Sequence, residues 1–198
     1  MERGQVVEFH YITSISNVTS ILQVGILSNR RAAQLPHASI AAQDVQDRRA
    51  QKPVPGGRPL HEYANLYFHA RNPMMFRRKA LHSQICVLQV STDVLDLEET
   101  VVATQNASSD YVAFRPASAG LAMLDYELVF ARDWRDPDQI TYFRKKSGRC
   151  AELLVPDRVP PELIVGVVCS CEESARTVRA VCDRPVSVDP DLFFQEAS

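Results

Sequence analysis

Residues 9–27 read FHYITSISNVTSILQVGIL and contain the two patterns that decide our interpretation of the fold. The first half is rich in β-branched and aromatic residues, which favour a strand, and we expect that strand to run over residues 6–13. The second half places Val18 and Leu22 at helical spacing, and Gly25 is suited to end a short helix. The segment therefore predicts a strand followed directly by a helix.

Short strands and helices alternate along the rest of the chain. Apolar or β-branched runs predict strands at residues 66–70, 85–90, 101–104, 151–155 and 163–169. We expect helices from Ser39 to about Gln51, from Pro73 to Lys79, over residues 137–146 and over residues 172–181. The polar stretch 105–110 is expected to lie on the surface. This irregular alternation favours an α+β fold with a mixed sheet over a regular βαβ series. No Gly/Ser-rich or Pro-rich stretch divides the chain, so we expect one domain over residues 1–198.

The composition is that of an ordinary globular protein. The chain has 45% hydrophobic and 23% charged residues, which excludes a disordered chain. The formal net charge is -2, so no global basic field attracts nucleic acid. Basic residues nevertheless cluster locally, at Arg30–Arg31, Arg48–Arg49, Arg77–Lys79 and Arg144–Lys146. Taken alone, such clusters are usually solvated faces.

The five cysteines follow no spacing typical of zinc ligands. Cys169-Ser170-Cys171 has no pair of histidines downstream, so we expect reduced cysteines and no metal. No apolar run approaches the roughly 18 residues of a membrane-spanning helix. The first residues do not resemble a signal peptide. We therefore expect a cytoplasmic protein without membrane attachment.

Glu152 is the residue that most needs an explanation, because it lies in the apolar run Ala151–Val155. A carboxylate in a buried strand is costly unless it is paired or belongs to a site. The same pattern fits a strand at the edge of a sheet with Glu152 facing solvent. Arg49, near the end of a predicted helix, fits an ordinary contact with the helix dipole. His10 and Tyr11, on the first strand, fit ordinary packing residues.

Several short motifs occur in a fixed order along the chain. They lie at residues 9–27, at Gln46–Arg49 (similar to Q-x-R-R), at 60–63, 67–68 and 71–74 (similar to L-H-D-Y-V-P-F-Y-F-x-x-R-S-P-M), at 124–126 (L-D-W), at 133–137 (W-x-D-P) and at 149–155 (R-Q-A-E-F-L-V). Together they resemble the DarT family, and the resemblance spans roughly residues 9–194.

This resemblance implies the ADP-ribosyltransferase fold, in which a mixed β core forms a cleft for NAD and carries peripheral helices. It also implies a reaction in which ADP-ribose is transferred from NAD to a base of single-stranded DNA, thymidine in one branch of the family and guanosine in another. NAD is then a substrate, and no metal is implied. Such enzymes act as toxins of toxin–antitoxin or phage-defence systems, so a macrodomain antitoxin is an expected partner.

Two residues match the catalytic pair of the family. Glu152 matches the catalytic glutamate, whose carboxylate stabilises the positive charge that develops on the ribose as nicotinamide leaves. Arg49 matches the arginine to which the family assigns activation of the base. Because the pKa of arginine exceeds ~12, binding the deprotonated base or the NAD pyrophosphate is easier for it than accepting a proton.

Further residues match positions that bind the two substrates. The resemblance implies contacts with NAD by His10, Tyr11, Ile12 and Thr13, with Leu27 and Arg49 beside the cofactor. Candidates for DNA phosphates are Arg71, Arg77, Arg78 and Arg149. For each of these four arginines, solvated surface charge is the alternative.

Three departures from the family pattern leave the acceptor open. Tyr11 stands where the family commonly has histidine, and His10 precedes it. Cys150 replaces a glutamine two residues before Glu152, at a position that often helps to choose the acceptor. Residues 102–105 read VATQ in place of V-F-T-D and lose an acidic residue. The modified base therefore stays open, and RNA remains an alternative acceptor.

Four other functions compete with transfer to DNA. A protein or RNA ADP-ribosyltransferase would share the fold and the NAD chemistry, and an NAD glycohydrolase would use water as the acceptor. A degenerate NAD-fold domain that only binds a partner is the non-enzymatic alternative. The presence of both Arg49 and Glu152 argues against degeneracy.

Overall fold

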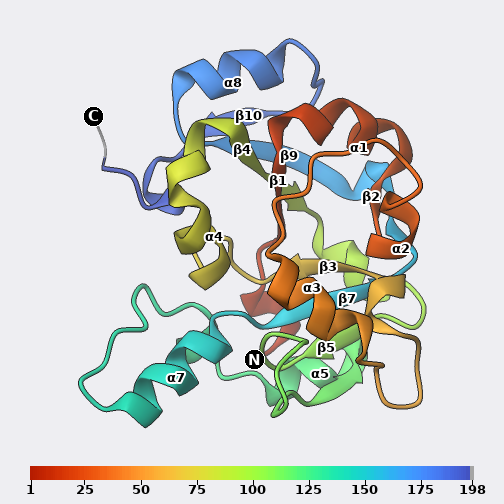
Figure 1. The fold of residues 1–198 in the computed structure, drawn as a ribbon, viewed down its shortest axis with the longest axis vertical. Coiled ribbons are helices and arrows are strands. Elements are labelled where there is room, and N and C mark those ends of the chain that lie inside the picture. Colours follow the sequence, from red (N-terminus) through yellow and green to blue (C-terminus); the bar gives the residue numbers. More distant parts are fainter. Residues whose placement is uncertain (197–198) are drawn as a thin grey trace.

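The computed structural model describes residues 1–196, which form strands, α-helices and short 3₁₀ helices (Figure 1). The strands are β1 (Phe9–Ser14), β2 (Ile26–Leu27), β3 (Tyr63–Tyr67), β4 (Ile85–Val90), β5 (Val101–Ala103), β6 (Phe114–Pro116), β7 (Glu152–Pro156), β8 (Arg158–Val159), β9 (Ile164–Cys169) and β10 (Val186–Val188). The α-helices are α1 (Val18–Val24), α2 (Asn29–Ala32), α3 (Gln43–Ala50), α4 (Pro73–Arg78), α5 (Ala117–Gly120), α6 (Tyr126–Val129), α7 (Gln139–Gly148) and α8 (Glu172–Arg179).

Eight of the strands form one sheet in the order β10-β9-β4-β1-β3-β7-β5-β6, and β2 pairs with β8. Strands β9 and β10 run parallel, whereas the other neighbours in this sheet run antiparallel. The sheet is therefore mixed, and the predicted α+β class is confirmed. In the described part of the chain, no helix is both long and apolar enough to span a bilayer.

The sheet divides between β1 and β3. These neighbours are joined by a single residue pair, His10 and Tyr67, although β1 pairs along its whole length with β4 and β3 pairs along its whole length with β7. Beyond His10, the two strands therefore diverge. Figure 1 shows β4 and β9 in the upper half of the molecule and β3, β7 and β5 in the lower half. A sheet that opens in this way leaves room for a ligand between its halves.

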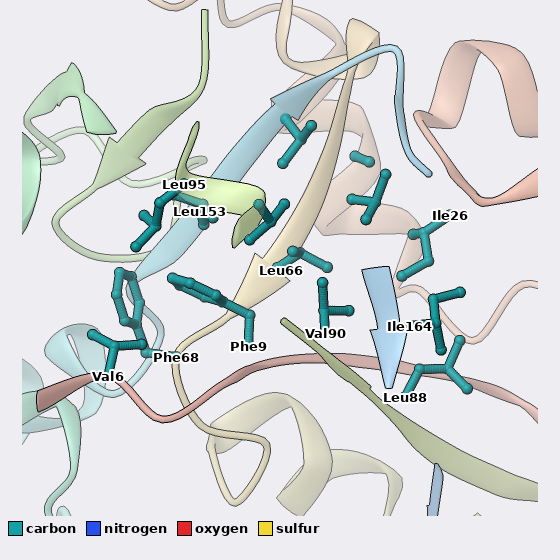
Figure 2. Packing of buried hydrophobic residues seen from close by; sticks show 14 of the residues in the cluster. Val6, Phe9, Ile26, Leu66, Phe68, Leu88, Val90, Leu95, Leu153 and Ile164 are labelled. Carbon is teal, nitrogen blue, oxygen red and sulfur yellow. The ribbon is translucent and has the colours of Figure 1, made fainter. Parts of the chain in front are cut away.

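One apolar cluster holds the two halves together (Figure 2). Phe9 of β1 packs against Phe68, which follows β3, with ring centroids 5.0 Å apart. Leu66 and Leu153 come from the lower strands, and Leu88 of β4 comes from the upper ones. Burial of each such side chain contributes about 1.5–3 kcal/mol, so the cluster fixes the relative position of the halves although few backbone bonds cross the division.

Several predicted elements are shifted in the structure. The strand predicted at residues 66–70 is β3, which ends at Tyr67, because the pairing with β7 begins at Tyr63. The helix expected from Ser39 begins only at Gln43, since the Ser39 hydroxyl accepts a bond from the Ala41 amide within a turn. Strand β4 and Gly25, which has a φ of 89° and ends α1, agree with the prediction.

Candidate active site

Glu152 is the first residue of β7, which lies between β3 and β5 inside the sheet. It stands opposite Tyr67 on one side and Ala103 on the other. Its side chain has no exposed surface. The alternative of an edge strand with Glu152 facing solvent is therefore wrong, and the carboxylate must be compensated inside the protein.

Two groups compensate the Glu152 carboxylate. Arg49 Nη1 donates to Oε2 at 2.9 Å and to Oε1 at 3.2 Å. The backbone amide of Ala107 donates to Oε1 at 3.0 Å. Arg49 is itself 5% exposed, so the ion pair is almost dry and much stronger than a surface pair. Apolar side chains of similar volume would stabilise the fold about as well as a buried ion pair. The presence of the pair therefore indicates a functional site.

The Ala107 bond also corrects the prediction that residues 105–110 lie on the surface. Ala107 and Ser108 are buried. The segment passes close to β7 because its backbone supplies a donor to Glu152. The prediction was wrong because it assumed that these polar side chains need water. Asn106 instead uses its side-chain oxygen to accept bonds from the amide and hydroxyl of Ser108.

A cavity of about 910 Å³ opens where β1 and β3 diverge. Arg49 lines it, whereas Glu152 lies behind the Arg49 guanidinium. The sequence-predicted residues that line it with Arg49 are Tyr11, Ile12, Thr13, Leu27, Arg77 and Arg78. The volume is at the upper end of the range of small-molecule sites, which is sufficient for a dinucleotide.

The cavity wall carries positive charge although the whole chain is slightly acidic. Its cationic side chains are Arg48, Arg49, Arg77, Arg78, Arg144 and Lys146, and no Asp or Glu lines it among residues 1–196. Cations gathered in a concave site attract anions far more than the net charge of -2 suggests. The site is therefore built for a phosphate-bearing ligand.

Two further lining residues lie beside Glu152. Burial raises the pKa of the Tyr67 phenol well above its usual range, and the Glu152 carboxylate raises it further. Burial, again with the Glu152 charge, raises the pKa of the Cys150 thiol to about 12. At neutral pH both groups are protonated, so Tyr67 can donate a hydrogen bond into the cavity. Cys150 is a thiol rather than a nucleophilic thiolate.

His61, in the 3₁₀ helix Leu60–Glu62, is close enough to Arg49 for that charge to affect its pKa. Burial and, secondly, the charge of Arg49 lower the pKa of His61, so the imidazole is neutral at pH 7. Its Nε2 is buried and has no partner among the described residues. Sequence reasoning assigned no role to His61 or Tyr67. The available signal was that both lie within motifs shared with the resembled family.

Besides Glu152, three predicted site residues do not line the cavity. His10 is buried with its Nε2 3.0 Å from Glu8 Oε1 and its ring 5.6 Å from that of His69. Arg149 is 2% exposed and donates to the carbonyl oxygens of Val129 and Arg71. These bonds hold the segment before β7, so Arg149 has a structural role in this conformation.

The third residue is Arg71, which bonds to the C-terminal part of the chain. Its Nε donates to the Asp191 carbonyl at 3.0 Å, and its Nη1 donates to the Arg132 carbonyl at 2.6 Å. Its guanidinium lies 4.2 Å from the ring centre of Phe194. Of the four predicted phosphate contacts, the structure therefore leaves Arg77 and Arg78 at the cavity.

The divided mixed sheet, with a buried glutamate and an arginine at its cavity, defines the ADP-ribosyltransferase class. Residues 10–194 match the family model described as "ssDNA thymidine ADP-ribosyltransferase, DarT". The chain belongs to the DarT family.

Relatives and solved structures agree with this assignment. A DNA ADP-ribosyl transferase of Thermus sp. strain 2.9 is 31% identical over 78% of this chain and 77% of its own length. A DNA ADP-ribosyl transferase–DNA ADP-ribosyl glycohydrolase fusion protein of Thermosipho africanus is 30% identical over 94% of this chain. The match covers 49% of that protein, so this chain spans about half its length.

The structural matches confirm the expected fold. Thermosipho africanus DarTG in complex with ADP-ribose superposes with a TM-score of 0.82 at 27% identity, over 95% of this chain and 51% of that one. Thermus sp. 2.9 DarT in complex with ADP-ribosylated ssDNA gives a TM-score of 0.80 at 24% identity, over 95% and 96% of the two chains. The residues described contain no group of three or more His, Cys, Asp or Glu that could hold a metal ion.

Proposed function

We propose that this chain transfers ADP-ribose from NAD to a base of single-stranded DNA. The observation that carries the proposal is the buried carboxylate of Glu152, paired with Arg49 at the wall of a large cationic cavity. The relatives named above, described as DNA ADP-ribosyl transferases, support it. A solved relative is described in complex with ADP-ribose, which supports NAD as the donor.

The carboxylate of Glu152 suits the chemistry of the donor. When the bond between nicotinamide and ribose breaks, its electron pair leaves with nicotinamide and the ribose gains oxocarbenium character. A fixed negative charge beside that ribose stabilises this state. Comparable preorganised groups contribute about 3–4 kcal/mol. Oε2 of Glu152 accepts one bond, whereas Oε1 already accepts two, so Oε2 retains a lone pair that a ribose hydroxyl can reach once the Arg49 guanidinium in front of it moves aside.

Arg49 has two tasks in this proposal. It offsets the charge of Glu152 while the cavity is open, and it presents the remaining N–H groups of its guanidinium to the cavity. Those donors can hold a pyrophosphate oxygen or the oxygen of an acceptor base as the base loses its proton. The attacking atom of the base then bonds to the ribose carbon that nicotinamide has left, and its proton passes to solvent water.

We propose thymidine as the first acceptor to test and guanosine as its competitor. The family model is described by thymidine, which supports the first choice. Cys150 lines the cavity as a small neutral thiol where the family has a glutamine, so the contact that reads the base differs here.

The biological role that we infer is that of a toxin with a macrodomain antitoxin that removes the modification. The fusion of a transferase with a glycohydrolase in the Thermosipho relative supports a pairing of the two activities. NAD and replicating DNA are both found in the cytoplasm, and we therefore assign the chain to that compartment.

The test compares acceptors directly. The protein is incubated with NAD labelled in its ADP-ribose part and with single-stranded DNA, duplex DNA, RNA or proteins of a cell extract. We expect label on single-stranded DNA that contains thymidine or guanosine. Label on RNA or protein instead, or nicotinamide release without a labelled polymer, would contradict the proposal and identify the alternative acceptor.

A further inference from the structure

Two exposed aromatic side chains border the cavity away from the Glu152–Arg49 pair. Tyr111, which follows the 105–110 segment, is 90% exposed, and Phe143 of α7 is 55% exposed. A single exposed apolar residue is ordinary, but two on the wall of one cavity form a surface to which a flat ligand can bind. Tyr142 supports Phe143, with ring centroids 5.3 Å apart.

The elements that carry these rings are tied to the cavity. The Ser147 hydroxyl of α7 donates to the Gln105 side chain, which joins α7 to the 105–110 segment. Lys52, just after α3, donates to the Ser109 carbonyl. These bonds tie the segments that carry Tyr111 and Phe143 to each other and to the end of α3.

Cationic side chains accompany the two rings. Arg144 and Lys146 of α7 also line the cavity, and Arg48 lines it from α3. Exposed aromatic rings beside cations, without a carboxylate on the wall among residues 1–196, match the requirements of a single-stranded polynucleotide, whose bases stack and whose phosphates need positive charge.

We propose that Tyr111 and Phe143 are stacking positions for bases that flank the modified one, and that Arg144 and Lys146 bind the adjoining phosphates. This proposal rests on the proposed function, since it places the polynucleotide substrate of the same site. It replaces Arg71 and Arg149, whose guanidinium groups bond to carbonyl oxygens, as the main positions that hold the strand.

The experiment measures binding of a fluorescent single-stranded oligonucleotide separately from binding of NAD. We expect Phe143→Ala and Tyr111→Ala each to weaken oligonucleotide binding roughly 5- to 150-fold, the range for loss of one stacked base. Phe143→Tyr and Tyr111→Phe should keep the oligonucleotide affinity of the wild type, because each retains an aromatic ring. Arg144→Gln should make the negative slope of log affinity against log salt concentration shallower by about 0.7, the loss of one phosphate contact.

Ile140→Ala is the matched control, because Ile140 is a 79% exposed apolar residue of the same helix that is not among the lining residues. It should leave oligonucleotide binding unchanged. A loss of NAD affinity equal to the loss of oligonucleotide affinity would assign the rings to the cofactor and overturn the proposal. Unchanged oligonucleotide binding in both alanine variants, or an equal loss in Ile140→Ala, would also overturn it.

The outcomes separate this inference from the proposed function. If the wild type modifies DNA but the ring variants bind it normally, only the placement of the strand is wrong. If the wild type binds the oligonucleotide through both rings and modifies no DNA, the binding surface stands and the proposed transfer to DNA fails.

Discussion

Replacing Arg49 by alanine would leave the Glu152 carboxylate buried with the Ala107 amide as its remaining donor among the described residues. The carboxylate has no exposed surface of its own. The perturbation therefore tests whether the pair is a coupled unit at the cavity or a chance contact between two charged side chains.

The expected cost follows from the geometry of the pair. At 2.9 Å and an effective dielectric constant of about 20, the Coulomb attraction is roughly 5–6 kcal/mol. Water from the adjoining cavity can enter the space left by the guanidinium and solvate the Glu152 carboxylate, which restores part of the lost stabilisation. We therefore expect Arg49→Ala to lower the free energy of unfolding by about 3 kcal/mol, at the lower end of the range for breaking a buried pair.

Urea unfolding of four proteins measures this cost. Arg49→Ala, Glu152→Gln and the double variant form a cycle with the wild type, and we expect a coupling free energy of about 2–3 kcal/mol. Arg48→Ala is the control, because the exposed Arg48 lies 3.7 Å from Asp44 in a surface pair worth less than about 1 kcal/mol. A loss in Arg49→Ala no larger than that in Arg48→Ala, or additive effects in the cycle, would show that Arg49 and Glu152 are not energetically coupled.

Burial lowers the pKa of His69 to about 4, so the unfolded chain binds more protons below pH ~6.5 and stability is lost as pH falls. Between about pH 7.5 and about pH 4.5, the free energy of unfolding should fall by up to about 2.5 kcal/mol more in the wild type than in His69→Gln. An equal fall in the two proteins would contradict this. Hydrogen bonding lowers the pKa of the Cys171 thiol, whereas burial raises that of Cys150 to about 12. Iodoacetamide should therefore modify Cys171 at least ~100-fold faster than Cys150, as measured by peptide mass mapping. Comparable rates would show that the Cys150 thiol is accessible. The buried Asn72 side chain accepts from two amides of α4, and Asn72→Ala should cost about 1–2 kcal/mol in urea unfolding, whereas a change below about 0.5 would contradict the cap.

The sequence predicts the strands more reliably than the opening of the sheet. Continuous apolar runs identify β4 and β9 because buried strands need apolar residues on both faces. The cavity depends on β1 and β3 pairing at His10 and Tyr67 alone, and no local pattern encodes how far two strands stay together. That property arises from the packing of the whole molecule.

The candidate site was predictable from motifs rather than from residue pattern. Arg49 and Glu152 lie 103 residues apart in sequence, and periodicity cannot bring them together. For Arg149, the motif match predicted a contact that the structure does not show. A cation just before the strand that begins with Glu152 suggests a phosphate contact, but here the guanidinium bonds to carbonyl oxygens of neighbouring loops, a use that depends on tertiary structure. The burial of Ala107 was missed for the same reason.

In the proposed reaction, the carboxylate of Glu152 stabilises the ribose of NAD as nicotinamide departs. The most direct measurement is the single-turnover rate of ADP-ribose transfer to single-stranded DNA by Glu152→Gln, with NAD affinity and unfolding measured on the same sample. We expect a rate about 10²–10³ times lower, with folding and NAD binding retained. A folded variant that transfers within threefold of the wild-type rate would contradict it.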